Sequence, residues 1–290
     1  MMEKEKYSQP VIDLIKNRSS IRSYESRPLD AQLREIIRIY LEAQTSGPLG
    51  HIMRFHLIEK DDPAILDNAR LGTYGFIKNA RYYIVGTVVP GEKHWEDYGY
   101  LLEKIILKMT DLELGTCWMG GSFKRSEFGK TINVLGTEVI PAITPVGYST
   151  LKRSLRDRTI RWAAKSHSRK VWESLFFEDD FQNQLRRDKL GEYAVVLDMV
   201  RLAPSASNKQ PWRVVYQKGQ YHFFLQRTPN YAGHIKSADL QRVDIGIAMA
   251  HFGLTARDLG LNGTWEDIRP EMELPQHCEY CITWKERSTC

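Results

Sequence analysis

The chain has 290 residues, enough for one large domain or two ordinary ones with a substantial core. Hydrophobic residues make up 42% and charged residues 27%, as in soluble globular proteins, and the net charge of +5 suits small anionic ligands without requiring nucleic acid. No apolar run approaches the roughly 20 residues of a membrane-spanning helix, and the charged N-terminus lacks a secretory signal. We therefore expect a cytoplasmic protein.

The first half of the chain predicts helices, strands and a long helix in turn. A helix is expected over 11–17, with Ser8 as its cap and Pro10 in its first turn. A second helix starts near Asp30, and its apolar face carries Leu33, Ile36, Ile37, Tyr40 and Leu41. Strands follow over 55–59 and 81–89, the second central in its sheet, and a long helix covers 96–112.

The second half predicts the same order of elements. A helix covers 191–202, and two strands within 211–226 form a hairpin across Lys218 and Gly219. A long helix over 239–258 and a strand over 278–284 complete the half.

An internal repeat explains this order. A shift of 147 positions superposes 97–118 on 244–265, where average residue frequencies would give about one or two identities. The identities are Asp97/Asp244, Gly99/Gly246, Leu107/Leu254, Asp111/Asp258, Leu112/Leu259, Leu114/Leu261 and Trp118/Trp265. Two unrelated amphipathic helices could share leucines, but glycine, aspartate and tryptophan in register favour a duplication.

The two copies differ where a ligand would bind. The segment 45–55 matches 204–214 at Ser46/Ser205 and Arg54/Arg213, but Leu49, Gly50 and His51 stand against Asn208, Lys209 and Gln210. The first copy ends in GTCWMGGSF (115–123) and the second in NGTWEDIRP (262–270). If each half once contributed to two sites, one of those sites has been lost.

Arginines and serines after the first helix suit a phosphate group. Arg18, Ser19, Ser20 and Arg22 offer two guanidiniums, which can bind phosphate oxygens bidentately, and two hydroxyls for the remaining oxygens. The alternative is a solvated helix end, where cations are favoured by the helix dipole.

Two further segments could reach a ligand. The basic stretch 151–170 could bind nucleic acid, phosphate or a membrane, although we interpret it as a solvated connection with one or two residues at a ligand. Gly115, Gly120 and Gly121 would let backbone approach a flat ligand, or would simply form a tight turn.

Several familiar motifs do not match. Neither a Rossmann fingerprint nor a P-loop is present. Cys278 and Cys281 have CxxC spacing, but zinc would need a second ligand pair, and a strand over them would direct the two thiols to opposite faces. We therefore expect neither metal nor redox chemistry at these cysteines.

Together these segments resemble the nitroreductase-like flavoprotein family, in its single-chain tandem form. RSSIR (18–22) is similar to the family's flavin-phosphate motif, and APSASNKQPWR (203–213) is similar to its Pro-Ser-x-x-Asn-x-Gln-Pro-Trp loop. Segments 74–85, 114–121, 146–149 and 168–177 resemble further family segments in the expected order.

The resemblance implies an α+β fold with mixed β-sheets flanked by helices. Two similar halves, 1–165 and 166–290, would be fused as an intramolecular pseudo-dimer, with flavin mononucleotide (FMN) at their boundary. One complete site is expected, because the arginine motif is in the first half and the intact loop in the second. Its residues would be Arg18, Ser19, Ser20, Arg22, Arg169 and Lys170 at the phosphate, and Pro204, Ser205, Ala206, Asn208, Met119, Gly120 and Gly121 along the ring.

Three positions depart from the family pattern. Thr73 and Phe76 stand where typical members have a polar pair that contacts the ring, and Ala206 replaces the second serine of the loop.

The implied activity is an FMN-dependent oxidoreductase that takes electrons from NADH or NADPH. A ping-pong reaction would reduce a small acceptor such as a nitroaromatic or a quinone, with the chemistry on the flavin and no catalytic acid or base. We expect a monomeric pseudo-dimer without nucleic-acid, membrane or metal partners. The alternatives are a flavin-binding or scaffold protein without turnover, and a basic module that binds anions or nucleic acid.

Overall fold

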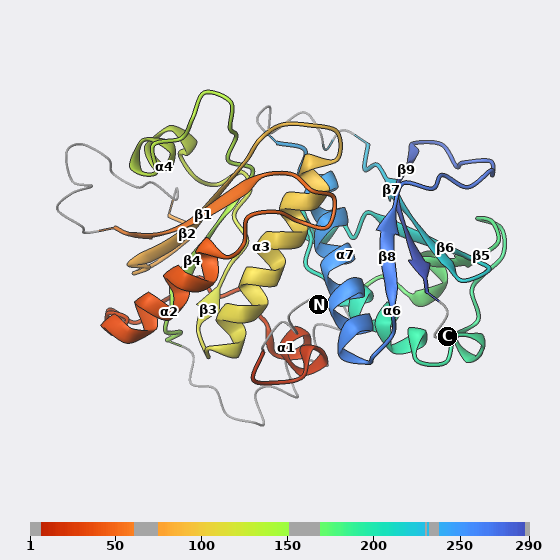
Figure 1. Cartoon of the computed structure of the whole chain (residues 1–290), viewed down its shortest axis with the longest axis horizontal. Coiled ribbons are helices and arrows are strands. Elements are labelled where there is room, and N and C mark those ends of the chain that lie inside the picture. The colour runs from red at the N-terminus through yellow and green to blue at the C-terminus, as the bar shows by residue number, and fades with distance from the viewer. Residues whose placement is uncertain (1–6, 61–74, 151–168, 230, 232–237, 288–290) are drawn as a thin grey trace.

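A computed structural model of the chain describes residues 7–60, 75–150, 169–229, 231 and 238–287 (Figure 1). The first half contains helices α1 (Val11–Asn17), α2 (Ala31–Glu42), α3 (His94–Asp111) and α4 (Arg125–Thr131). Its antiparallel sheet has the order β1-β2-β4-β3, from strands β1 (Met53–Glu59), β2 (Tyr82–Val88), β3 (Gly115–Thr116) and β4 (Ile143–Gly147).

The second half forms a mixed sheet of order β5-β6-β7-β9-β8. Its strands are β5 (Phe176–Glu178), β6 (Trp212–Gln217), β7 (Gln220–Gln226), β8 (Gly263–Glu266) and β9 (Cys278–Glu286). The helices are α6 (Tyr193–Arg201) and α7 (Leu240–Asp258), with short 3-10 turns η1 (Trp172–Ser174), η2 (Arg187–Lys189) and η3 (Ala206–Asn208). The chain is therefore a mixed α+β protein, as the sequence predicts.

The two sheets repeat one strand order. In the second sheet, β6-β7-β9-β8 follows the sequence of connections seen in β1-β2-β4-β3, and β5 is the additional strand. β5 runs parallel to β6, whereas every other pair in that sheet is antiparallel. The addition lies at the outer margin of the sheet (Figure 1).

Helices α3 and α7 pack side by side at the centre of the molecule, between the two sheets (Figure 1). α7 is buried on all sides from Val243 to Ala256, as expected of a helix enclosed by protein. The close approach requires glycine, since a Cβ on Gly99 would lie 2.2 Å from the Val243 carbonyl oxygen, and one on Gly246 would lie 1.9 Å from that of Glu96.

The long predicted elements are confirmed, with two local corrections. Ser8 does not cap α1, because its N–H and hydroxyl both bond the Asp111 carboxylate and Pro10 occupies the cap position. Ile36 lies outside the buried face of α2 and is 42% exposed, whereas Ile37 and Leu41 are buried. The sequence did not predict the short strands β3, β5 and β8, nor α4 and β4.

Within the described ranges, no helix is long and apolar enough to cross a membrane.

Candidate functional site

Arg18 lies inside the protein directly after α1. Its backbone N–H donates to the Leu14 carbonyl, and its side chain is 5% exposed, with Nε 3.6 Å from Glu103 Oε1. The chain then runs beside β3, where the Ile21 N–H donates to the Thr116 carbonyl over 2.8 Å. Ser19 is half-buried, and Ser20 and Arg22 are exposed, so the predicted phosphate motif has one inward and one outward arginine.

Glu103 joins Arg18 to the second half of the chain. It is fully buried on α3, accepts a 2.6 Å hydrogen bond from Trp118 Nε1, and lies 2.9 Å from Nε2 of His251 on α7. His251 is fixed through its other ring nitrogen, 2.8 Å from the Met199 carbonyl. A buried carboxylate that is shared in this way holds the arginine against both central helices.

The loop 204–210 has an unusual backbone and is fixed by side chains. Ser207, Asn208 and Gln210 have φ values of 50°, 55° and 48°, which non-glycine residues adopt only when their surroundings enforce them. The Gln210 N–H donates to Ser205 Oγ over 2.9 Å, so the Ser205 hydroxyl closes the loop.

Asp244 of α7 holds the same loop through backbone hydrogen bonds. Its carboxylate accepts the Ala206 N–H at 3.0 and 3.1 Å, and burial raises the pKa of this acid well above its ordinary value. Asp97, its match in the repeat, accepts the N–H groups of Leu49 and His51 at 2.9 Å each. In each half, the aspartate at the matching position therefore accepts backbone N–H groups of the matching loop.

Arg169 binds the loop and lies near enough to Arg18 for the two charges to interact. Its Nη1 donates to Asn208 Oδ1 over 2.7 Å and its Nη2 to the Leu202 carbonyl over 3.0 Å. Burial and the nearby guanidiniums of Arg18 and Arg201 lower the pKa of Arg169 to about 10. Burial is the larger cause of this shift, and the repulsion from the two other guanidiniums shows a local excess of positive charge that an anion would offset.

Lys170 extends this cationic region. Its N–H donates to Gln210 Oε1 over 2.8 Å, and its ammonium lies 3.3 Å from the Gln210 carbonyl oxygen. Burial, with Arg213 and Lys209 nearby, lowers the pKa of Lys170 to about 8. The predicted residues Arg18, Arg169, Lys170 and Asn208 are therefore brought together from both halves.

The segment 119–121 approaches the start of α7. Met119 is 2% exposed, its side chain belongs to a smaller core beside the first sheet, and its N–H donates to the Ile143 carbonyl over 3.0 Å. A Cβ on Gly120 would lie 2.6 Å from the Leu240 methyls, so glycine allows the two halves to touch here. Gly121 is exposed.

Some predicted residues have no mutual side-chain contact in the described part of the chain. No hydrogen bond joins the side chains of Ser19, Ser20 or Arg22 to the loop 204–210. Of the departures from the family pattern, Phe76 is 59% exposed, and Thr73 lies outside the described residues, as does the basic segment 151–168.

Sequence reasoning missed Glu103, His251, Asp244 and the 2% exposed Gln210. Asp244 had a usable signal, because it coincides with Asp97 in the repeat. Gln210 comes two residues after Asn208, the last residue of the loop predicted to bind the ligand. Glu103 and His251 match Ala250 and Lys104 in the repeat, so the repeat gives no signal for either of them.

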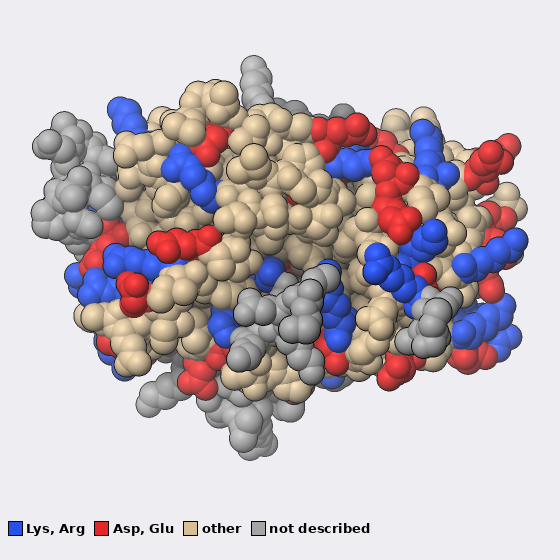
Figure 2. Space-filling view, viewed as in Figure 1, with Lys and Arg blue, Asp and Glu red and all other residues tan. Residues whose placement is uncertain are grey.

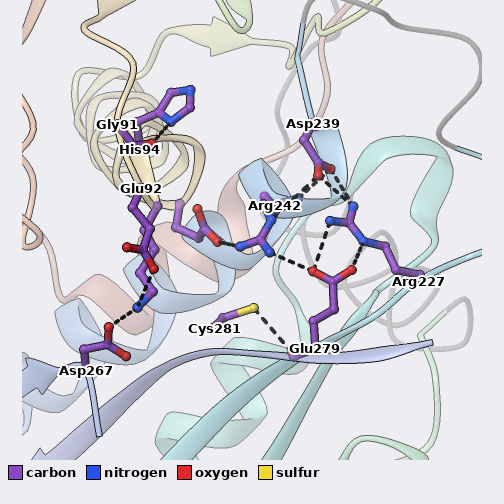
Figure 3. Close-up of polar contacts among 11 residues, drawn as sticks. Gly91, Glu92, His94, Arg227, Asp239, Arg242, Asp267, Glu279 and Cys281 are labelled. Carbon is purple, nitrogen blue, oxygen red and sulfur yellow. Dashed lines mark hydrogen bonds and ion pairs between the residues drawn. The ribbon is translucent and has the colours of Figure 1, made fainter. Parts of the chain in front are cut away.

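The counterpart of the Gly120–Leu240 contact is an ion pair. The same shift of 147 positions leads from Gly120 to Asp267 and from Leu240 back to Lys93, and these two side chains are paired in the structure (Figure 3). A cavity of about 660 Å³ lies beside them, with charged walls that include Asp239, Arg242 and Glu279.

An ion-pair network crosses the floor of this region (Figure 3). Arg242 contacts Glu96 Oε1 at 2.6 Å and Glu279 Oε2 at 2.7 Å, and Arg227 contacts Asp239 and Glu279, each at 2.7 Å. Burial raises the pKa of Glu96, against the opposing effect of Arg242. Paired charged side chains thus surround the position of Asp267, whereas the matching position in the first half is Gly120.

The cysteine pair lies on β9, where Cys281 is buried and Cys278 is partly buried. Cys278 and Cys281 are both free thiols, and burial raises the pKa of each, to about 11 for Cys278. No cluster of three or more potential metal ligands occurs among the described residues. Figure 2 shows acidic and basic side chains intermingled on the visible face, without a broad field of one sign.

Comparison with known proteins is consistent with this architecture. The family model described as "Putative TM nitroreductase" matches residues 10–256. A crystal structure of a "putative nitroreductase" from Thermotoga maritima has 19% sequence identity and a TM-score of 0.61, and the match covers 98% of this chain and 97% of that one. No curated protein matches the chain.

Shorter nitroreductases match about half of the chain. A "Putative NADH dehydrogenase/NAD(P)H nitroreductase" from Bacteroides thetaiotaomicron has 18% identity and a TM-score of 0.41, covering 50% of this chain and 90% of its own. A "putative nitroreductase in complex with fmn" from Desulfovibrio desulfuricans has 21% identity and a TM-score of 0.38, covering 51% and 94%.

Two sheets of one strand order around a crossed helix pair, with this full-length structural match, define the nitroreductase fold. Because the family model covers most of its length, the chain belongs to the TM nitroreductase family. Membership makes it an oxidoreductase of the nitroreductase type.

Proposed function

We propose that the chain binds one FMN at the junction of its halves and uses NADH or NADPH to reduce a small acceptor such as a nitroaromatic or a quinone. The observation that carries the proposal is the meeting of Arg18 from the first half with the loop 204–210 of the second, through Arg169. Neither half holds both parts of this arrangement.

The residues present fit a flavin phosphate. Arg18, Arg169 and Arg201 lie close together with the Glu103 carboxylate beside them, so a dianionic phosphate would offset the remaining positive charge. Lys170, with its pKa of about 8, is protonated at neutral pH and adds to the attraction. Ser19, Ser20 and Arg22 follow Arg18 and would complete the phosphate contacts.

The loop and the glycine segment would hold the ring. Pro204, Ser205, Ala206 and Asn208 stand on a backbone whose shape is enforced by Ser205 Oγ and Asp244, which leaves little disorder to lose on binding. Met119 would contribute backbone only, because its side chain is in the core. Gly120 and Gly121 lack side chains that would block a flat ligand.

When bound, FMN would accept a hydride from a nicotinamide and pass electrons to an acceptor that takes the nicotinamide's place. The protein would supply orientation and positive charge, and no side chain of the described site is assigned as a catalytic acid or base. Arg169 and Lys170 would stabilise negative charge on the bound molecule.

One site per chain is supported by the asymmetry of the halves. The position that matches Gly120 carries Asp267 in an ion pair, and Leu49 stands where the second half has Asn208. We further propose that 1–165 and 166–290 are the two halves of a monomeric pseudo-dimer, which acts in the cytoplasm. The boundary at 165/166 lies outside the described residues.

The deciding experiment is flavin stoichiometry with reduction. Purified chain should carry or take up one FMN, and anaerobic NADH or NADPH should bleach its absorbance, with an acceptor restoring it. Two flavins per chain would contradict the single site. Uptake without bleaching would favour the alternative of a flavin-binding protein without turnover, and no uptake would reject the flavin site.

A further inference from the structure

Among the described residues no strand covers the outer edge of β1, whereas the matching edge of the second sheet is covered by β5. β1 ends its sheet, and among the described strands only β2 pairs with it. In the second sheet, β6 stands at the matching position and carries β5 on its outer side. The described part of the chain therefore contains two copies of the same edge, and a further strand fills only the second.

The repeat gives the register of the unfilled edge. Arg54 matches Arg213, so Phe55, His56 and Leu57 match Val214, Val215 and Tyr216. These three residues of β6 are the ones that pair with β5, at Phe176, Phe177 and Glu178.

Backbone groups of β1 point outward at the matching positions. The Val89 N–H donates to the Ile52 carbonyl and the Lys60 N–H to the Arg81 carbonyl, which places even-numbered residues in hydrogen-bonded pairs with β2. Phe55 and Leu57 consequently direct their N–H and C=O groups away from β2. Within the described residues these groups have no partner, whereas the Val214 N–H of β6 donates to the Leu175 carbonyl over 2.9 Å.

Two grooves flank this edge. One of about 340 Å³ runs between α2 and β1 and is lined by Leu41, Met53 and Phe55; another of about 160 Å³ is lined by Ile58, Tyr82 and Ile132. Both are also lined by Arg38, His56 and Leu57. An added strand would offer its alternate side chains to the two grooves.

Charge indicates what the strand should contain. Arg38 is exposed, lines both grooves, and has no acidic partner among the described residues, whereas Arg34 beside it is paired with Glu59. Glu42 lines the larger groove only. An acidic residue that follows apolar ones, as Glu178 follows Phe176 and Phe177 in β5, would place a carboxylate near Arg38.

We propose that the outer edge of β1 binds an extended segment of a partner polypeptide, rich in aromatic residues and ending in an acidic one, which adds parallel to β1 as β5 adds to β6. Main-chain hydrogen bonds at Phe55 and Leu57 supply the pairing, and the two grooves with Arg38 supply the selectivity.

The test uses a fluorescein-labelled peptide of sequence VWESLFFEDD, which is residues 171–180, and the full chain. Fluorescence anisotropy should show saturable binding, and hydrogen exchange should show new protection of the Phe55 and Leu57 amides. Arg38→Glu should weaken binding at least tenfold, and Leu57→Pro should abolish it by removing an outward N–H. Arg38 is a surface residue, so its variant remains informative if Leu57→Pro does not fold.

Three results would overturn the proposal. One is an absence of binding at millimolar peptide. Another is protection of Val214 in place of Phe55 and Leu57, which would show exchange with β5. The third is protection of the Phe55 and Leu57 amides without peptide, which would show that the edge is already covered by this chain or a second copy.

Discussion

Gly99 of α3 and Gly246 of α7 face each other where the two central helices cross. A Cβ on Gly99 would lie 3.1 Å from the Gly246 Cα, and the two residues also occupy matching positions of the internal repeat. Matching residues meet in this way only near an axis that relates the two copies by a half-turn. The contact therefore locates the local symmetry axis of the molecule.

Alanine at the crossing should destabilise the whole protein. Gly246→Ala would drive a methyl group into the Glu96 backbone, where neither helix can move without the other, at a cost of about 3 kcal/mol in the free energy of unfolding. Denaturant unfolding measures it. Gly253→Ala on the same helix is the control, since its Cβ would meet only side-chain atoms at 3.3 Å and should change the stability by less than about 1 kcal/mol.

Two serines at matching positions of the repeat, Ser205 and Ser46, should differ in their effect on FMN binding. Ser205→Ala removes the acceptor of the Gln210 N–H, so the loop 204–210 becomes less ordered. Ordering it on binding should then cost about 1 kcal/mol more, which weakens FMN binding about fivefold. Ser46→Ala, at the matching exposed position, should leave the FMN dissociation constant unchanged. Equal effects of the two variants in a fluorescence titration would argue against a single site.

Substitutions at either end of the proposed site should both weaken FMN binding. Arg22→Ala and Asn208→Ala should both weaken FMN binding, the latter about tenfold because it removes the acceptor of Arg169 Nη1. Gly50→Ala should not, although its φ of 87° makes alanine strained and lowers stability by about 1 kcal/mol. Equal losses in all three would contradict the model, with isothermal titration as the measurement.

The cationic region should make anion binding depend on pH. The pKa of Lys170 is lowered from 10.5 to about 8 in the folded chain, so between these values the unfolded chain holds the proton and stability rises with pH. Below about pH 8 Lys170 is charged in the folded chain, and the cost of burying this charge lowers the free energy of unfolding. A bound phosphate would reduce that cost. Inorganic phosphate or FMN should therefore raise the melting temperature more at pH 7 than at pH 9.5.

Lys170→Gln is the control for that pH dependence. It should flatten the difference between pH 7 and pH 9.5 while the chain stays folded, because the lysine N–H that contacts Gln210 belongs to the backbone. A difference that persists in the variant would assign the titration to another group.

The buried carboxylate on α3 should be essential for stability. Glu103→Ala removes the acceptor of Trp118 Nε1 and the partner of His251 Nε2, and takes the carboxylate from beside Arg18. The expected loss in the free energy of unfolding is about 3–5 kcal/mol. Glu103→Gln, which keeps an acceptor oxygen, should lose less, and a loss as large as that of alanine would contradict the role assigned to the hydrogen bonds.

Long periodic segments made much of this fold predictable. α3, α7 and the hairpin β6–β7 follow from apolar spacing and from the Lys218-Gly219 turn, and the repeat predicted the relation between the halves. Two-residue β3 and three-residue β5 are too short for a periodic signal, and their pairing is decided by distant strands. Glu103 could not be predicted, because a charged residue in an amphipathic helix is usually solvated and only tertiary contacts bury it.

The crossing of α3 and α7 also governs when the proposed site can form during folding. Gly99 and Gly246 are 147 residues apart, so the contact closes a loop of about half the chain and belongs to the slow, non-local part of folding. A growing chain completes its first sheet well before α7 exists. Arg18 therefore meets its neighbours from the second half only late in folding. Binding of the proposed FMN would have to follow that step.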